Sequence, residues 1–319
     1  MRKSFCILVA AGALVLAAHP AAAQYPARPV RMVLTFPAGG PLDIVTRAIA
    51  LPLAQALGQP VVVENKPGGD GLIAADAVAK SAPNGYTLFL ASSALASVPA
   101  LHKSPPFDPL ADFTPVTSVG SFSFFVFVHA SVPANSLAEL VDYARAHPGK
   151  MTYGTASTTA MLASAQLLSM AKVAMVHVPY KGDPPAFSDF TNGRVQMMIG
   201  APLFWLPQVK AGKLRALGTL LTRRSSLLPE VPTMAEAGFP GISFVPWAAL
   251  LGPAGMPKEI VERLNRDVRA VLQRQEVGEQ LDKLAFQTSG STPEELAAYL
   301  REQIEVWRNT ARDAGIVPR

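Results

Sequence analysis

Apolar and polar positions follow two alternating periods along most of this chain. Short apolar runs at 30–36, 86–90 and 195–199 have the length and β-branched content of buried strands. Between such runs, apolar residues recur at helical spacing, and in 43–57 they occupy positions 44, 45, 48, 49, 53 and 57. Strands that alternate with helices form βαβ units. The pattern therefore predicts an α/β fold with mostly parallel sheets.

The predicted strands are too numerous for one comfortable sheet. Other apolar runs predict strands at 61–63, 124–128, 151–153, 175–178 and 214–220. Two extended segments rich in aromatic and β-branched residues, 116–128 and 242–251, are expected to cross between two lobes. We therefore expect residues 24–123 and 248–319 to form the first lobe and residues 124–247 the second, with a ligand cleft between them.

The first 23 residues have the features of an export signal. A basic pair, Arg2-Lys3, precedes the apolar stretch 5–18, which is too short to span a bilayer comfortably. Ala21-Ala22-Ala23 then supplies the small-residue pattern of a cleavage site. We predict that residues 1–23 are a cleaved signal peptide and that the mature protein is periplasmic.

Composition narrows the possible partners. Half of the residues are hydrophobic and 16% are charged, as in a globular chain. The single cysteine, Cys6, lies in the predicted signal peptide, so the mature chain must rely on its core rather than on disulfides. Basic residues are scattered, which argues against nucleic acid, and the histidines lack metal-binding spacing. We expect a monomer without a cofactor or a metal.

The stretch VRMVLTFPAGGPLDIVTRAIA, residues 30–50, is the first candidate site. A helix that begins near Pro41 would have proline at N1, where its missing N–H costs nothing. Gly39 and Gly40 would leave backbone N–H groups and the positive helix end facing outward. Asp43 would lie near N3 and hold the first turn. The junction is either an anion-binding loop or simply a well-capped start of a helix.

Two later junctions repeat the order of strand, glycine and helix. After Gly154, hydroxyl residues precede the helical pattern 161–170, and they could donate to an anion, or one could be the N-cap. At the second junction, Gly182 is followed by Asp183, which we expect to cap its helix rather than to contact a ligand. Tyr180 is the better candidate there for facing a cleft.

These motifs, in this order, resemble a known family. They include Phe36-Pro-Ala-Gly-Gly-Pro-Leu-Asp43, Tyr153-Gly154, Pro179-Tyr-Lys-Gly182, Leu228-Pro-Glu-Val-Pro-Thr233 and Pro253-Ala-Gly255. Over nearly the whole mature chain, the sequence resembles the Bug family, the periplasmic solute-binding proteins of tripartite tricarboxylate transporters. The resemblance implies a type II periplasmic-binding-protein fold. It also implies a small organic carboxylate held between two lobes and delivered to a membrane permease, without catalysis.

The resemblance also implies ligand contacts. The first loop would hold a carboxylate, partly through ordered water, and the loop after Gly154 would supply opposing contacts. The candidate ligand-binding residues are Phe36, Pro37, Ala38, Gly39, Gly40, Asp43, Ser92, Ser93, Thr155, Ser157, Thr158, Thr159, Tyr180 and Gly200. Gly200 stands where relatives often carry an aspartate suited to a substrate ammonium, so an amino acid is a less expected ligand. Phe204 and Trp205 either line the pocket or, as we expect more, pack in the core.

Three other functions compete with this one. Gly69-Asp-Gly71-Leu-Ile-Ala74 matches a dinucleotide-binding fingerprint, but the next strand ends at Ser93 without the acidic residue that would bind a ribose. An exported hydrolase has little support, because the chain has no G-x-S-x-G motif and no cysteine after processing. A ligand sensor that reports to a membrane kinase would use the same fold, and the sequence leaves this alternative open.

Overall fold

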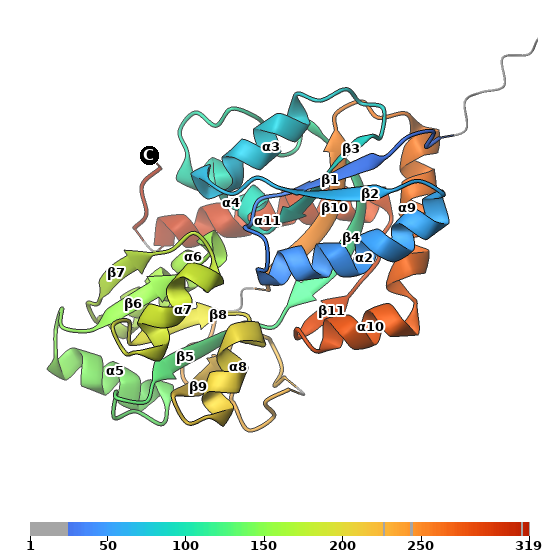
Figure 1. Cartoon of the computed structure of the whole chain (residues 1–319). Helices are drawn as coiled ribbons and strands as arrows, with labels where there is room; N and C mark the ends of the chain where they lie inside the picture. Colours follow the sequence, from blue (N-terminus) through green and yellow to red (C-terminus); the bar gives the residue numbers. More distant parts are fainter. Residues whose placement is uncertain (1–24, 226, 243–244, 314, 319) are drawn as a thin grey trace, which may run out of the picture.

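The structure, a computed structural model, describes residues 25–225, 227–242, 245–313 and 315–318. The predicted signal peptide, 1–23, lies outside the described residues. Two sheets, each packed with helices, form two lobes that lie side by side (Figure 1). Elements from both ends of the described chain build the first lobe, and elements from its middle build the second (Figure 1). This is the two-lobed α/β fold that was expected.

The first lobe is built on a six-stranded sheet with the strand order β11-β4-β10-β3-β1-β2. Its strands are β1 (Val30–Leu34), β2 (Val61–Asn65), β3 (Thr87–Ser92), β4 (Phe113–Phe122), β10 (Trp247–Pro253) and β11 (Phe286–Thr288). Its helices are α2 (Pro41–Leu57), α3 (Leu72–Ala79), α4 (Ala94–Leu101), α9 (Lys258–Leu272), α10 (Gln275–Asp282) and α11 (Pro293–Asp313), with a short 3₁₀ turn, η1 (Gly69–Gly71). Helices α2, α9 and α10 pack together, and α4 packs against α11.

The second lobe is built on a five-stranded sheet with the strand order β7-β6-β8-β5-β9. Its strands are β5 (Phe125–His129), β6 (Thr152–Thr155), β7 (Val176–Pro179), β8 (Met197–Gly200) and β9 (Leu214–Thr219). Its helices are α5 (Leu137–Ala146), α6 (Thr158–Ala171), α7 (Asp183–Thr191) and α8 (Pro202–Lys210). Helix α6 also contacts α4 and α11, so the two lobes touch.

The expectation of mostly parallel sheets holds only for the βαβ units. Strand β1 is parallel to β2 and β3, and β6 is parallel to β7 and β8. Strands β10 and β5 are antiparallel to their neighbours in the two sheets. Strands β10 and β5 are antiparallel because each one follows a crossing from the other lobe. Each of these strands enters its sheet from the side where β3 or β8 ends, as the pairs Ala248–Ser92 and Phe125–Gly200 show.

The two crossings lie side by side at the boundary between the lobes. Strand β4 ends at Phe122 and β5 begins at Phe125, so the first crossing is very short. The second returns the chain to β10, which begins at Trp247. The backbone N–H of Phe122 donates to the carbonyl of Pro246 at 2.8 Å, which joins the two crossings. Side chains on these segments therefore border any space between the lobes.

Candidate functional site

Helix α2 begins after the first loop, residues 37–40, as the sequence predicts, but the N–H groups of this loop have other acceptors than expected. Gly40 is the N-cap of α2 and Pro41 is its first residue. However, the N–H of Gly39 donates to Asp43 Oδ2 at 2.9 Å, and the N–H of Gly40 donates to the carbonyl of Pro37 at 3.3 Å. In this structure both N–H groups therefore have acceptors within the loop, and a role for them in ligand binding stays a prediction. They close the loop on itself.

Asp43 holds this loop from the inside. Its carboxylate is buried and accepts hydrogen bonds from the Gly39 N–H, from Arg47 Nε at 3.0 Å and from Asn65 Nδ2 at 2.9 Å. Burial alone would raise the pKa of Asp43, but the hydrogen bonds from Arg47, Gly39 and Asn65 outweigh it and lower the pKa. All three donors belong to the first lobe. Asp43 therefore shapes the loop rather than offering a group to a ligand.

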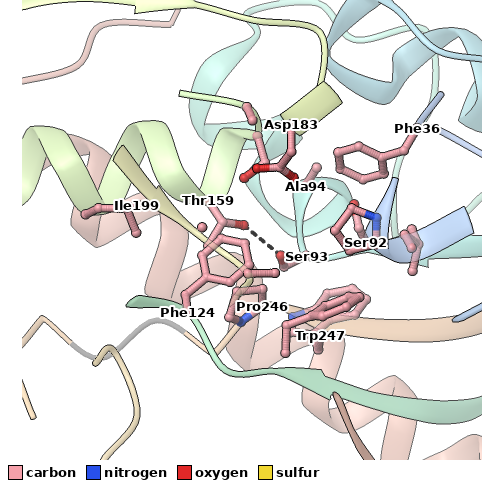
Figure 2. Close-up of a pocket in the computed structure, with 17 residues that line it drawn as sticks. Phe36, Ser92, Ser93, Ala94, Phe124, Thr159, Asp183, Ile199, Pro246 and Trp247 are labelled. Atoms are coloured by element: carbon pink, nitrogen blue, oxygen red, sulfur yellow. Dashed lines mark hydrogen bonds between the residues drawn. The ribbon is translucent and has the colours of Figure 1, made fainter. Parts of the chain in front are cut away.

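A cavity lies between the lobes, beside the crossings (Figure 2). The space between its walls, including a part open to solvent, is about 570 Å³. Four aromatic residues contribute to its wall: Phe36, Phe122, Phe124 and Trp247. The remaining lining residues are Pro41, Leu42, Ser92, Ser93, Ala94, Ala156, Ser157, Thr159, Asp183, Ile199, Gly200, Ala201 and Pro246. The wall is thus apolar and aromatic, with a few hydroxyls and one carboxylate.

Five helices begin at this cavity. The lining includes the N-cap or an early residue of α2, α4, α6, α7 and α8. The first N–H groups of a helix have no acceptor inside the helix and carry its positive end. Among the described residues that line the cavity there is no lysine, arginine or histidine. Any attraction of this cavity for an anion must therefore come from backbone groups at the helix ends.

The structure separates the predicted ligand-binding residues into three sets. Those that line the cavity are Phe36, Ser92, Ser93, Ser157, Thr159 and Gly200. Those that line a second space, of about 1400 Å³ and also partly open to solvent, are Pro37, Thr155, Thr158 and Tyr180. Those that line neither space are Ala38, Gly39, Gly40 and Asp43. The two spaces adjoin, because Phe36, Ala94, Ala156 and Ser157 line both.

Direct contacts join the lobes on two sides of the cavity. The hydroxyls of Ser93, in the first lobe, and Thr159, in the second, are buried and lie 2.8 Å apart (Figure 2). Elsewhere, Gly182 faces the ring of Pro37. A Cβ at Gly182 would lie 3.1 Å from Pro37 Cγ, and the φ of Gly182, +109°, disfavours any other residue. The lobes are therefore in contact around the cavity.

Two of the predicted polar residues already have partners. The Tyr180 hydroxyl donates to Asp189 Oδ2 at 2.8 Å. Burial and this hydrogen bond raise the pKa of Tyr180 to about 12. Thr155 Oγ1 lies 2.7 Å from His177 Nε2, and burial lowers the pKa of His177. Tyr180, Thr155 and His177 line the second space, and their polar groups are held by these hydrogen bonds.

The sequence-based prediction missed residues that the structure brings to the cavity, above all Asp183 and Trp247. Asp183 was expected to cap its helix, but Gly182 is the N-cap and Asp183 is the first helical residue. Three buried atoms of the lining have no hydrogen-bond partner among the described residues: Asp183 Oδ1, Trp247 Nε1 and Ser92 Oγ. Burial raises the pKa of Asp183 to about 6, against the lowering effect of the Trp205 indole and of its own backbone N–H.

A sequence signal existed for the aromatic wall. Trp247, Phe122 and Phe124 lie on or beside the two predicted crossings, and residues on crossings must border the space between lobes. Trp205, by contrast, is fully buried in the core of the second lobe, and Phe204 packs against it. The core placement expected for these two side chains is therefore confirmed.

Two searches of the described part of the chain found nothing. Within residues 25–225, 227–242, 245–313 and 315–318, no helix combines the length and the apolar character needed to cross a membrane. Over the same ranges, histidine, cysteine, aspartate and glutamate form no group of three or more that could hold a metal ion.

Comparisons with known proteins match the whole described fold. The family model described as "Tripartite tricarboxylate transporter family receptor" matches residues 45–316. BugT of Bordetella pertussis is 36% identical over 312 residues, which cover 94% of this chain and 93% of BugT. The solved structure of Rpa4515 from R. palustris with adipate has a TM-score of 0.88 and 33% identity, covering 92% of this chain and 100% of the other.

A second solved structure agrees. MatC from Rhodopseudomonas palustris with bound malate has a TM-score of 0.83 and 30% identity, covering 90% of this chain and 99% of MatC. The matched family is one of transporter receptors rather than enzymes, and this chain is likewise a binding protein. The motifs, the two lobes and the cavity of helix ends thus agree with the matches: the chain belongs to the Bug family, the receptors of tripartite tricarboxylate transporters.

Proposed function

We propose that the protein captures a small organic carboxylate in the cavity between its lobes and delivers it to a membrane permease of the tripartite tricarboxylate type. The observation that carries this proposal is the convergence of five helix N-termini on a cavity lined by no basic side chain. The adipate in Rpa4515 and the malate in MatC, both carboxylates, support the same class of ligand.

The magnitudes are consistent with useful affinity. A carboxylate at one exposed helix end gains only about 0.3–1 kcal/mol, and ~2 kcal/mol where the site is partly buried. Micromolar binding requires about 8 kcal/mol. One loop is therefore insufficient, whereas five ends around one enclosed anion give a stabilisation of that order. Contact with the rings of Phe36, Phe124 and Trp247 adds apolar burial.

Ligand binding would favour the closed arrangement of the lobes. We propose residues 24–123 with 248–319, and residues 124–247, as the two units that move about the crossings. A ligand that contacts both units stabilises closure by as much as it binds the closed form better than the open form. We also propose that residues 1–23 export the protein and are removed, and that the mature protein acts as a monomer.

The first test is a thermal-shift screen of the mature protein after unfolding and refolding to remove carried-over ligand. The panel holds tricarboxylates, aliphatic and aromatic dicarboxylates, monocarboxylates and amino acids. A ligand at 100 times its dissociation constant adds about 2.7 kcal/mol of stability, which is easily measured as a higher melting temperature. If no carboxylate raises the melting temperature, the proposed function is wrong.

Trp247→Phe tests whether this cavity is the site. The substitution keeps a ring but removes a buried N–H that has no hydrogen-bond partner among the described residues. If that N–H donates to the ligand, affinity falls about tenfold or more, as expected for one lost hydrogen bond to a charged group. Trp307→Phe is the matched control, since Trp307 is buried in the first lobe and does not line the cavity. It should leave affinity unchanged.

A further inference from the structure

The cavity has one ionisable side chain in its wall, that of Asp183. Among its described lining residues, the others are apolar side chains, hydroxyls, glycine and Trp247. Figure 2 shows the Asp183 carboxylate directed toward Thr159 and Ser93. Its Oδ1 is shielded from solvent, yet among the described residues no group donates to it at normal hydrogen-bond geometry. A cavity built to attract an anion thus also contains a carboxylate with one oxygen that lacks a well-aligned donor.

The immediate surroundings of this carboxylate carry no compensating charge. Strand β8 faces it with Gly200, and α8 faces it with Trp205, whose indole nitrogen also lacks a partner at hydrogen-bond geometry. The charged residues nearest in the chain are Lys181, which is exposed on the second space, and Asp189, which pairs with Arg194 at 2.9 Å. From the first lobe, the nearby cavity residues Phe36 and Ala94 are not titratable.

An ionised carboxylate in such a position is costly to the empty protein. Burial without a hydrogen bond disfavours the charged form, and the N-terminus of α7 offsets only part of that cost. A neutral residue at this position would avoid the cost. A ligand that brings its own N–H or O–H reduces it, because its donor adds a hydrogen bond to the carboxylate, which lines the cavity.

We propose that Asp183 accepts a hydrogen bond from the ligand, so that the cavity prefers carboxylates that also carry a donor, an ammonium or a hydroxyl group. The inference rests on the proposed function, since it places the ligand in the same cavity. It also revises the sequence-based argument against an ammonium. Gly200 provides no acid, but Asp183 Oδ1 lies 3.4 Å from the position that a Cβ at Gly200 would occupy. An acid from α7 therefore occupies that part of the cavity.

Matched ligands test the proposal directly. Isothermal titration at pH 7.5 compares carboxylates of one skeleton that end in methyl, hydroxyl or ammonium, with chains of three to six carbons and with one phenyl-bearing set. The wild-type protein should bind at least one hydroxyl or ammonium member tenfold or more tightly than its methyl partner. Asp183→Asn should lose most of that preference. Asp142→Asn is the matched control, an exposed aspartate of the same lobe, and should keep it.

A relocated acid sharpens the test. The double variant Asp183→Ser with Gly200→Asp should recover the preference, because the new carboxylate enters the same part of the cavity from β8. Should the Asp183 variants fail to fold, wild-type protein gives the answer through pH. The preference for the donor-bearing ligand over its methyl-ended partner should fall as pH falls from 7.5 to 5, where Asp183 becomes protonated, and the shared carboxylate of the two ligands corrects for titration of the ligand itself.

The outcomes separate the two proposals. If carboxylates bind but the wild type shows no preference, or if Asp183→Asn keeps the preference, the role of Asp183 is overturned and the proposed function stands. If pH leaves the preference unchanged in the wild type, the role of Asp183 is overturned as well. If no carboxylate binds, the proposed function fails, and the inference fails with it.

Discussion

Two aspartates at helix N-termini, one in each lobe, have opposite environments. Asp43 is the third residue of α2 and accepts from Gly39, Arg47 and Asn65, so its pKa is lowered. Asp183 is the first residue of α7, has a buried oxygen without a donor, and has a pKa raised to about 6. Both helix ends favour a negative charge. The hydrogen bonds from neighbouring elements make the difference.

One residue type thus stabilises structure in the first lobe and, in our proposal, serves binding in the second. At Asp43 the protein itself supplies every donor that the carboxylate needs, and the result is a fixed loop. At Asp183 the protein leaves a donor out. The first arrangement stabilises the folded chain without a ligand, whereas the second is completed only when something enters the cavity.

The largest expected effect comes from breaking the satisfied carboxylate. Asp43→Ala removes the acceptor of three donors, including the N–H of Gly39 in the first loop, and should cost about 2–4 kcal/mol of unfolding free energy. Urea denaturation at pH 7.5 measures it. Asp142→Ala, at an exposed ion pair, should change stability by no more than about 0.5 kcal/mol. Equal effects of the two variants would contradict the role given to Asp43.

Substitution of the carboxylate that lacks a donor should change the unfolding free energy in the opposite direction. Asp183→Asn should stabilise the empty protein at pH 7.5 by about 1–3 kcal/mol, because it removes a buried charge whose pKa is raised in the folded state. A raised pKa means that ionisation favours the unfolded chain. The gain should therefore shrink as pH falls through about 6 and vanish below about 4. Urea denaturation along this pH range measures it, and a destabilised variant at pH 7.5 would reverse the comparison.

Acid should also distinguish the two sites in the wild-type protein. The pKa of Asp43 is lowered in the folded state, so its contribution to stability is fully present above the unfolded pKa of about 3.9 and is lost as pH falls through the folded pKa. The stability difference between wild type and Asp43→Asn should stay constant from pH 5 to 8 and narrow only below about pH 4. If the stability difference between wild type and Asp43→Asn narrowed near pH 6, the raised pKa would belong to Asp43, and the comparison with Asp183 would be wrong.

The smallest expected effect lies at the glycines of the first loop. Gly39 has a φ of +79° and open space where a Cβ would lie, so Gly39→Ala should cost only the backbone strain, about 1–2 kcal/mol. The N–H of Gly39 is already bound to Asp43, so carboxylate affinity should change little. Thermal melting and titration measure the two quantities. A large loss of affinity without a loss of stability would show that this N–H serves the ligand after all.

Local rules in the sequence predicted where elements begin but not which polar groups remain free. Pro41 at the start of α2 and Asp43 in its first turn followed from helix-capping chemistry. The same chemistry indicates that an acid at the third position can take an N–H just before the helix, so the capture of the Gly39 N–H was within reach. The contact of Asp43 with Asn65, 22 residues away, could not be predicted in this way, because it depends on the register between β1 and β2.

The cavity itself depended even more on tertiary contacts. The surroundings of Asp183 depend on Gly200 and Trp205. These residues belong to other elements and lie near its carboxylate only in the folded lobe. Trp247 reaches the cavity because two crossings lie next to each other, which no local pattern encodes. The sequence therefore predicted the loops around the site better than the individual side chains in it.

The five helix ends have a consequence for how this protein can change over generations. A point mutation can delete a lysine or an arginine, but apart from proline no substitution removes a backbone N–H. The attraction for an anion is therefore inherited with the fold itself. Side chains such as Asp183, Trp247 and Phe124 can vary without erasing it. Under the proposed function, exchange of one carboxylate for another in this cavity would then require changes in side chains alone.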